Sequence, residues 1–422
     1  MSKKAKNKIP LLGADKFILA LERHDKHSGS TGNSCQYIIE VDANFDEKAF
    51  EQAIQTNEII QWLASLSLSL NIKKPNQWTA ENKSKQTIEL KKHNKLFNNN
   101  LERIKFNPKL APLFYFELYK KDESKKTIVF TWHHLLMDGY GAGLLIQNLL
   151  DPTKIQPYQR DKSAVNWSNF IKAVKAKRFV SKSAKGKIGM LQVTTEENIT
   201  QITSILSFSR NETTQIEENA KRNGAKFGPS SFFLAATSIA VNEYRNRENL
   251  PTEDFWIPVP QNNRKKGERW PILGNHISML FYRLKKEKYN SLEALTQSIV
   301  DQMIVQIKEK QTNHYNHLMN YLRPVNSSIY SRMIKGPNGN SLSSFLFTVA
   351  SDNNSEMKDF FGGKITNQLS IPPNTFPPGL TFAFNYFNGS LSVIIQSYKH
   401  IIDERQMKML EKDLRNVLLA DY

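Results

Sequence analysis

The sequence predicts an α/β fold, and three observations support this prediction. Segments rich in β-branched and aromatic residues alternate with segments whose apolar residues recur at helical spacing. One strand-like segment, residues 128–132, leads through two histidines and an Asp-Gly pair into a helix-like run at residues 141–150. After a basic stretch the alternation starts again at residue 202, so the 422 residues suit two domains or one large domain of two similar halves.

The sequence predicts several elements before the strand at residues 128–132. These are, in order, an amphipathic helix at residues 14–23, a strand at 36–42 and a strand at 114–119. Asp46 is a suitable N-cap for a further helix that contains Phe50 and Ile54. The charged residues 120–124 turn the chain from the strand at 114–119 into the strand that ends in the two histidines.

The strand at residues 128–132 lacks polar alternation, which is typical of a strand buried on both faces. Adjacent side chains on an extended segment point to opposite faces, so His133 and His134 are not expected to act as a pair. One of them should face the core and the other a cavity. Asp138 can fold back to fix the loop, and Gly139 supplies the conformational freedom that the turn needs. Such a strand end is a rigid support for a catalytic base.

Residues 152–192 interrupt the α/β pattern, because they contain few bulky apolar residues and many basic ones. The basic residues are Lys172, Lys175, Lys177, Arg178, Lys182, Lys185 and Lys187. We interpret the segment as a crossover between the halves, with residues 167–174 as its candidate helix. Aromatic residues are not interleaved with the lysines, so a solvated linker is favoured over a nucleic-acid site.

The second half predicts a new series of strands and helices. A strand at residues 202–209 precedes a helix capped by Asn211, and residues 232–244 form a helix that is apolar nearly all round. Prolines interrupt the strand at residues 255–260, which favours a sheet edge or a channel wall. The remaining elements are a strand through residue 282, helices at 292–311 and 315–322, a strand at 343–349, a hairpin at 380–387 and 391–396, and a helix at 404–419.

Composition limits the class of protein. With 39% hydrophobic and 23% charged residues the chain is globular rather than disordered. Cys35 is the only cysteine, so no intrachain disulfide can form, which fits a reducing compartment. The basic N-terminus is not followed by an apolar core, and the apolar stretches are too short to span a bilayer, so we expect a soluble, cytoplasmic protein. A net charge of +18 reflects a lysine-rich background or an attraction to phosphates, an acidic partner or anionic lipid.

The residues His133-His134-Leu135-Leu136-Met137-Asp138-Gly139 read as HHxxxDG. This motif resembles the signature of the CoA-dependent acyltransferase superfamily, which includes chloramphenicol acetyltransferase, condensation domains of peptide synthetases and bacterial wax ester synthases. The resemblance implies two chloramphenicol acetyltransferase-like lobes in a V-shaped pseudo-dimer with a central channel. It places an N-terminal lobe at residues 1–165, a basic crossover at 166–200 and a C-terminal lobe at 201–422.

The resemblance also implies a mechanism and a set of site residues. His134 would be the general base, in a catalytic motif with His133, Asp138 and Gly139, while an acyl group passes from a CoA or carrier-protein thioester to a hydroxyl or amine. Arg264 and the pair Gly274-Asn275 match a second family pattern, in which the arginine pairs with Asp138 across the halves. Candidate oxyanion or channel residues are Asn275, Ser343 and Ser344. The thioester carries CoA or phosphopantetheine as co-substrate, and no permanently bound cofactor or metal is required.

The sequence disfavours a metal site and a dinucleotide site. A zinc site is disfavoured because histidines that face opposite ways do not converge, and Gly139-Tyr-Gly141-Ala-Gly143 lacks the context of a dinucleotide loop. A catalytically silent module that only binds a carrier protein or an acyl ligand remains the alternative. The sequence does not choose between ester and amide products, or between a small-molecule and a lipid acceptor. Peripheral membrane contact stays open, and nucleic acid is not an expected partner.

Overall fold

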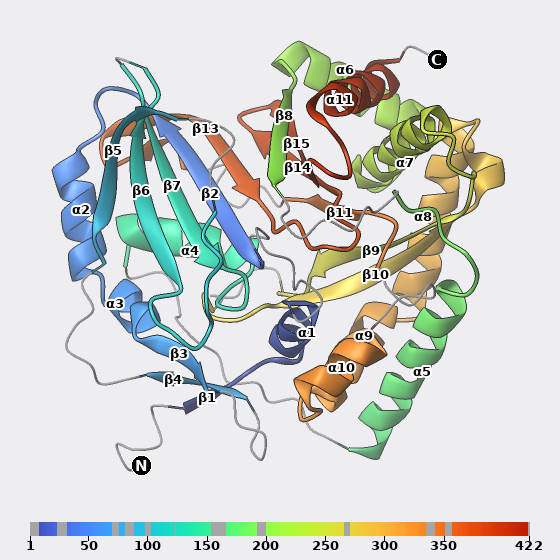
Figure 1. Ribbon diagram of the computed structural model, residues 1–422, viewed down its shortest axis with the longest axis horizontal. Helices are drawn as coiled ribbons and strands as arrows, with labels where there is room; N and C mark the ends of the chain where they lie inside the picture. Colours follow the sequence, from blue (N-terminus) through green and yellow to red (C-terminus); the bar gives the residue numbers. More distant parts are fainter. Residues whose placement is uncertain are drawn as a thin grey trace.

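The computed structural model describes most of the chain, and Figure 1 shows two sheet-bearing halves side by side. The described residues are 8–22, 32–69, 76–80, 88–97, 103–122, 124–152, 166–191, 200–265, 271–334, 342–350 and 357–420. The start of the basic tail, residues 1–7, and the end of the predicted crossover, residues 192–199, lie outside this part. The mixture of strands and helices confirms the predicted α/β fold.

A six-stranded sheet forms the half on the left of Figure 1. Its strands, in spatial order, are β12 (Asp359–Phe360), β13 (Gly363–Ile371), β2 (Ser34–Val41), β7 (Lys126–His133), β6 (Phe114–Lys120) and β5 (Leu90–Leu96). Neighbouring strands are antiparallel except β5 and β6. The helices of this half are α2 (Glu47–Thr56), α3 (Glu58–Ala64) and α4 (Gly139–Leu150). Asp46 caps α2 as predicted, accepting a hydrogen bond from Ala49 N at 3.0 Å.

Strand β7 is buried on both faces, as its unbroken apolar sequence predicts. Phe130 belongs to the core of the N-terminal half together with Phe50 and Leu145. The neighbouring Val129 points the other way and shares a cluster with Ile394 of the second half. Helices therefore cover one face of the sheet and a second sheet packs on the other, so neither face of β7 is exposed to solvent.

The second half holds a four-stranded sheet. Its strands, in spatial order, are β11 (Leu346–Val349), β14 (Thr381–Phe387), β15 (Ser390–Tyr398) and β8 (Gln201–Ser207). The helices that share its core are α6 (Arg210–Arg222), α7 (Ser230–Arg247), α8 (Leu292–Lys308) and α11 (Glu404–Leu419). The predicted hairpin and the predicted closing helix are confirmed.

The predicted cap of α6 is wrong by two residues. Ser209, not Asn211, is the N-cap: its hydroxyl accepts a hydrogen bond from Glu212 N at 3.3 Å, and the Glu212 carboxylate accepts one from Ser209 N at 2.8 Å. This reciprocal capping box satisfies two backbone donors at once, which a single asparagine cap does not do. The helix therefore begins at Arg210 and contains Asn211.

A separate two-stranded ribbon consists of β9 (Phe255–Asn262) and β10 (Ile277–Leu284), which pair along their full length. The strand is not interrupted at the prolines, since Pro258 lies opposite Phe281 and Pro260 opposite Met279. The predicted position at a sheet edge or a channel wall is confirmed, because β9 has one partner strand and both prolines line the cavity between the halves. Pro258 and Pro260 lie two and four residues after Trp256, so their backbone nitrogens point to the same side of the strand as that of Trp256. The Trp256 N–H donates to Ser344 and not to β10. A proline at such a position removes no hydrogen bond from the ribbon.

Helix α5 (Trp167–Ser183) is about twice as long as the predicted candidate helix, because it continues through the lysine-rich residues. It packs against α9 (Gln311–Leu322), and its buried residues are Ala173 and Ala176. Two alanines make only a narrow apolar stripe, which is why the sequence resembles a linker. Near this pair lie α1 (Gly13–Glu22) and α10 (Ser327–Met333).

Strands late in the sequence complete the sheet of the first half, because β13 hydrogen-bonds to β2. The division into lobes at residues 1–165 and 201–422 remains a prediction. Smaller elements are the sheet of β1 (Lys8–Pro10), β4 (Gln77–Ala80) and β3 (Leu66–Ser69), and the 3₁₀ turn at Lys286–Lys288. Among the described residues, no helix has the length and apolar character needed to cross a membrane.

Candidate active site

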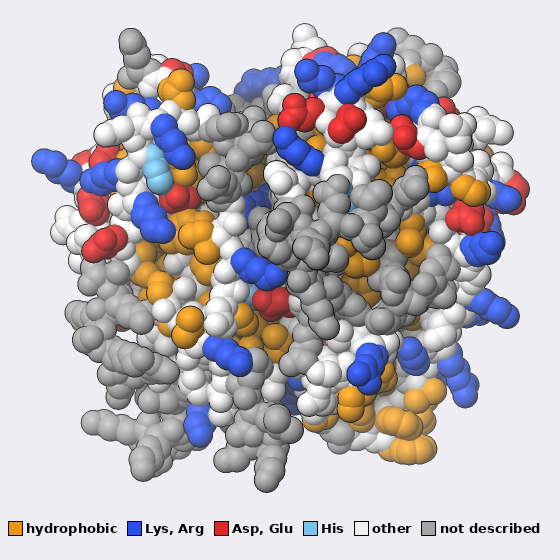
Figure 2. Space-filling model, viewed as in Figure 1, with side chains coloured by type: hydrophobic (Ala, Val, Ile, Leu, Met, Phe, Trp, Pro, Cys, Tyr) orange, Lys and Arg blue, Asp and Glu red, His pale blue; other side chains and the backbone are white. Residues whose placement is uncertain are grey.

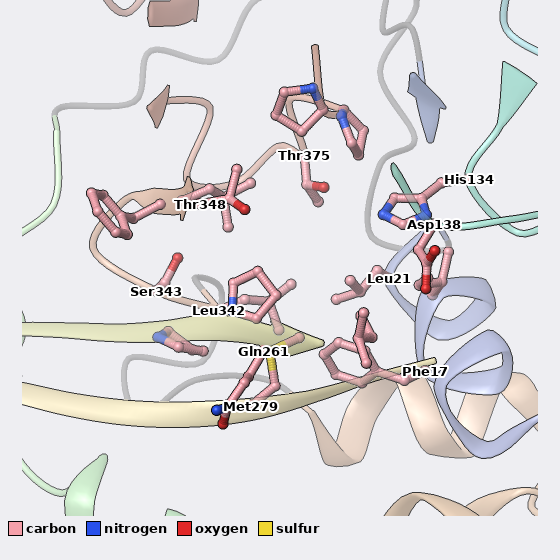
Figure 3. Close-up of a pocket in the computed structure, with 18 of the residues that line it drawn as sticks. Phe17, Leu21, His134, Asp138, Gln261, Met279, Leu342, Ser343, Thr348 and Thr375 are labelled. Atoms are coloured by element: carbon pink, nitrogen blue, oxygen red, sulfur yellow. The ribbon is translucent and has the colours of Figure 1, made fainter. Parts of the chain in front are cut away.

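A cavity of about 770 Å³ lies between the two halves. It is lined by α1, the loop after β7, the β9–β10 ribbon and residues around β11 and β13. Figure 3 shows Phe17 and Leu21 near His134 and Asp138, with Met279, Ser343 and Thr348 farther along the cavity. The size falls within the range of small-molecule sites, and most of the lining is apolar.

His134 is the histidine that faces this cavity. Its Nδ1 is buried, and the partly buried side chain lines the cavity. Burial lowers the pKa of His134 below its ordinary value of 6.5, and the nearby carbonyls of His134 and Met137 and the charge of Asp138 oppose this only in part. The imidazole is therefore neutral at neutral pH, and one of its two ring nitrogens has a lone pair that can accept a proton.

His133, the last residue of β7, faces the interior instead, whereas His134 is the first residue of the turn that follows. Its side chain is 1% exposed, its Nε2 lies 3.2 Å from Glu22 Oε1, and its Nδ1 accepts a hydrogen bond from Leu135 N at 3.0 Å. Both ring nitrogens thus have partners, one in α1 and one in the loop. His133 is not part of the cavity wall, and its contacts hold the loop in place.

Asp138 joins three segments of the chain. Its carboxylate accepts hydrogen bonds from Gly141 N at 2.8 Å, from His276 N at 2.8 Å, and from Arg264 Nη1 and Nη2 at 2.7 and 2.9 Å. The side chains of Asp138 and Arg264 are only 5% and 3% exposed. The guanidinium also lies over the Tyr140 ring, 4.7 Å from its centroid. The expected ion pair is therefore present as a bidentate, buried contact across the two halves.

The charge of Asp138 is stabilised despite its burial. Burial alone would raise the pKa of this carboxyl, but the charge of Arg264 and the hydrogen bonds from Arg264 and Gly141 leave the pKa below its ordinary value. Asp138 is therefore ionised at neutral pH and keeps the guanidinium compensated.

The loop of residues 134–138 is also clamped through its backbone. Gly274 N donates to Leu136 O at 2.8 Å, and Gly274 has a φ of +94° that favours glycine. Asn275 Nδ2 donates to His134 O at 2.8 Å and to Asp15 Oδ1 at 2.9 Å. The segment from Arg264 to His276 thus holds the histidine loop at both ends.

Asn275 was an oxyanion candidate, but its amide donors already have these two acceptors, and its side chain is not on the cavity wall. Its partner Asp15 is fully buried in α1 and also accepts from Asn275 N and Leu12 N. Burial raises the pKa of Asp15 to about 7, against the lowering effect of these hydrogen bonds. Sequence reasoning missed Asp15, because an aspartate in a first helical turn usually serves only the helix terminus.

The two candidate serines differ in position. Ser343 lies on the cavity wall, well apart from His134 in Figure 3. Ser344 points into the protein, where its hydroxyl accepts from Trp256 N at 3.1 Å and its N donates to Trp256 O at 2.9 Å. The structure does not bring Ser343, Ser344 and Asn275 together around His134.

The backbone freedom that we expected of Gly139 is not needed at this residue, and the close approach that requires a glycine is at Gly141. Gly139 is the first residue of α4 and is not among the glycines with positive φ, so the turn does not require its freedom. The close approach is at Gly141, where a Cβ would lie 2.6 Å from Ile272 O. The sequence also gave no signal that Phe17 and Leu21 line the cavity, since an apolar helix face usually packs in a core.

The comparisons with known proteins support membership of the CoA-dependent acyltransferase superfamily, whose signature the HHxxxDG motif resembles. Within it the chain belongs to the condensation-domain family, whose model, described as "Condensation domain", matches residues 6–336. It is 25% identical over 272 residues to bacitracin synthase 3 of Bacillus licheniformis, a match that covers 58% of this chain and 4% of that protein. The chain therefore spans only a small part of the length of this relative.

Solved structures share the fold at low sequence identity. The trichothecene 15-O-acetyltransferase TRI3 of Fusarium sporotrichioides is 12% identical with a TM-score of 0.72, covering 99% of this chain and 96% of that one. The first condensation domain of the calcium-dependent antibiotic synthetase, in complex with a substrate analogue, is 12% identical with a TM-score of 0.70, covering 98% and 96%. The starter condensation domain of rhizomide synthetase, in complex with C8-CoA, is 12% identical with a TM-score of 0.67, covering 98% and 95%.

Breaking the pair between Asp138 and Arg264 should destabilise the protein. Asp138→Ala leaves a buried guanidinium without a counter-ion, so we expect the free energy of unfolding to fall by about 3–5 kcal/mol. Denaturant unfolding measures this change. The double variant Asp138→Leu/Arg264→Met, which strands no charge, should recover part of the loss. A change below about 0.5 kcal/mol in Asp138→Ala, the size expected of a surface substitution, would contradict the described pair.

Proposed function

We propose that the chain is an acyltransferase that moves an acyl group from a CoA or carrier-protein thioester to a hydroxyl or amine, with His134 as general base. The observation that supports this most directly is a neutral imidazole on the wall of a mostly apolar cavity. A general base must be deprotonated and within reach of the acceptor proton, and both conditions fit His134. The transferase class follows from the family, whereas this role of His134 and the substrates are the proposal.

In the proposed reaction, His134 takes one proton from the acceptor and returns it to the leaving thiolate. Nε2 of His134 takes the proton of the acceptor while the acceptor oxygen or nitrogen attacks the thioester carbonyl. The tetrahedral intermediate then breaks its carbon–sulfur bond, and the leaving thiolate receives the proton from the imidazolium. His133 and Asp138 act as positioning residues, because their contacts fix the loop that carries His134. No step needs a metal or another cofactor.

The donor is proposed to be a phosphate-bearing thioester, because Lys177 and Lys185 lie on the cavity wall and are exposed. Both belong to the lysine-rich stretch around α5, a helix without any acidic residue. Figure 2 shows lysines and arginines spread over both halves of the visible face, with acidic side chains among them. Similar proteins bound to C8-CoA or to a substrate analogue support a CoA or carrier-linked donor.

Replacing the proposed base should stop turnover without unfolding the protein. We expect His134→Ala to lower thiol release from acyl thioesters by about 10²–10⁴-fold, the usual contribution of general base catalysis. Thiol release is measured with CoA and pantetheine thioesters and a panel of alcohols and amines. His317→Ala, on α9 and off the cavity wall, is the matched control and should keep wild-type turnover.

The outcomes of this panel separate the alternatives. Unchanged turnover in His134→Ala removes His134 as the base. A wild-type chain that binds a carrier protein or an acyl ligand but releases no thiol with any acceptor would instead be the silent binding module.

The pH dependence of kcat/KM should follow the titration of His134. Because the base must be neutral and burial lowers its pKa, activity should rise with pH, reach half its maximum below pH 6.5 and stay level through neutral pH. An alcohol acceptor is used, since an amine would add its own titration. Activity that continues to rise above pH 8 would exclude a base with a lowered pKa. Circular dichroism at each pH controls for unfolding.

Removing the two wall lysines tests the donor. The double variant Lys177→Ala/Lys185→Ala should raise the KM for a CoA thioester about 5–100-fold and change kcat little, because charge-assisted contacts to phosphate bind ground state and transition state alike. The control is Lys182→Ala/Lys187→Ala, which also removes two positive charges but at residues that do not line the cavity. Equal KM values in both double variants would argue against a phosphate contact at Lys177 and Lys185.

A further inference from the structure

The cavity wall has very few acidic side chains. Among the described residues that line the cavity, Asp138 is the one acidic side chain, whereas Arg264, Lys177 and Lys185 are cationic. The oxygens of Asp138 already accept hydrogen bonds from Gly141, His276 and Arg264. The wall therefore offers no free carboxylate to a cationic ligand.

The carboxylate of Glu22, in the neighbouring α1, does not change this balance. Its Oε1 lies 3.2 Å from His133 Nε2, on the inner side of the loop, and Glu22 is not part of the wall. Asp15 is likewise directed to Asn275 and Leu12 and is buried away from the cavity. Glu22 thus contacts His133, Asp15 contacts Asn275, and neither carboxylate lines the cavity.

Most of the wall beside and beyond His134 is apolar, and polar side chains on it such as Asn33, Gln261 and Thr375 are uncharged. Phe17 and Leu21 of α1 lie near the imidazole, and Met279 lies farther along. Trp256 and Phe281, whose rings stack at a centroid distance of 5.9 Å, continue the wall of the ribbon. An ammonium group on a ligand in this space would lose hydration without gaining a counter-ion, which is strongly unfavourable. An alkyl chain would instead gain burial of its methylene groups.

We propose, on the basis of the function proposed above, that the acyl group carried into this cavity is uncharged and apolar, so that the donor is an aliphatic acyl thioester and not an aminoacyl thioester. The α-ammonium of an aminoacyl donor would stand next to the thioester carbonyl and hence close to His134. There it would meet the Arg264–Asp138 pair, which is already neutral as a unit, and the side chains of Phe17 and Leu21. The selection is thus made by charge, next to the reacting carbon.

Two donors that differ in one group test this directly. The 4-methylpentanoyl and leucyl thioesters of pantetheine have the same carbon skeleton, and the leucyl donor adds the α-ammonium. At pH 6.5, below the pKa of the amino group, binding is measured by calorimetry on His134→Ala and thiol release on the wild-type protein. We expect the uncharged donor to bind at least about tenfold more tightly and to have the higher kcat/KM.

The results distinguish this inference from the proposed function. Equal or tighter binding of the leucyl donor, with thiol release intact, would overturn the apolar preference and leave the acyltransferase in place. If the wild-type protein neither binds nor consumes any thioester, the proposed function fails and this inference fails with it.

A designed carboxylate provides the matched variant. Leu21→Glu places an acid beside His134, and it should bring the ratio of the two binding constants close to one. Leu21→Gln has the same shape without the charge and should keep the wild-type ratio. If both variants keep that ratio, or both lose it, charge at this position does not select the donor.

Discussion

The buried contact between Asp138 and Arg264 is the interaction on which the site depends. Four hydrogen bonds converge on one carboxylate, from the helix that follows the loop and from the segment between β9 and β10. A buried carboxylate with fewer donors would tend to be protonated, and a buried guanidinium without it would be uncompensated. The pair is stable only when the two halves of the molecule are together, so the histidine loop has its shape only in the complete fold.

The two adjacent histidines of this loop have different roles. His133 is the last residue of β7 and His134 is the first residue of the turn that follows, and their side chains lie on different sides of the loop. His133 turns inward, with Glu22 and Leu135 N as partners, and anchors the loop. His134 turns to the cavity, where burial keeps its imidazole neutral at neutral pH. The same local geometry thus separates a structural imidazole from one suited to proton transfer.

Sequence reasoning succeeded where a pattern is local. The unbroken apolar run of β7, the hairpin of β14 and β15 and the opposite directions of the two histidines follow from side-chain periodicity and turn chemistry. It failed where a second signal competes with the first. Ser209 and Glu212 form a capping box, so Ser209 and not Asn211 is the N-cap. The buried residues of α5 are only Ala173 and Ala176, with Phe179 and Val180 partly buried beside them, so its apolar side is hard to recognise among the lysines.

Contacts between distant segments were not predictable from the residues alone. The pairing of Arg264 with Asp138 was expected through the family resemblance, not from spacing. The Asp15–Asn275 contact, which joins α1 to the loop before β10, has no sequence signature. The cavity wall is likewise invisible in the sequence, because Phe17 and Leu21 have the spacing of ordinary core residues. Such sites come from packing, and packing is set by the whole chain.

The central claim is that His134 is a neutral imidazole that faces the cavity with Nε2 available. Nuclear magnetic resonance of histidine-labelled protein tests it most directly, with the His134 signals assigned by comparison with His134→Gln. We predict a pKa below 6.5, a proton on Nδ1 in the neutral form, and a shift of the Nε2 resonance when an acyl thioester is added. An imidazole that titrates at or above 6.5, or that does not respond to any thioester, would contradict the account.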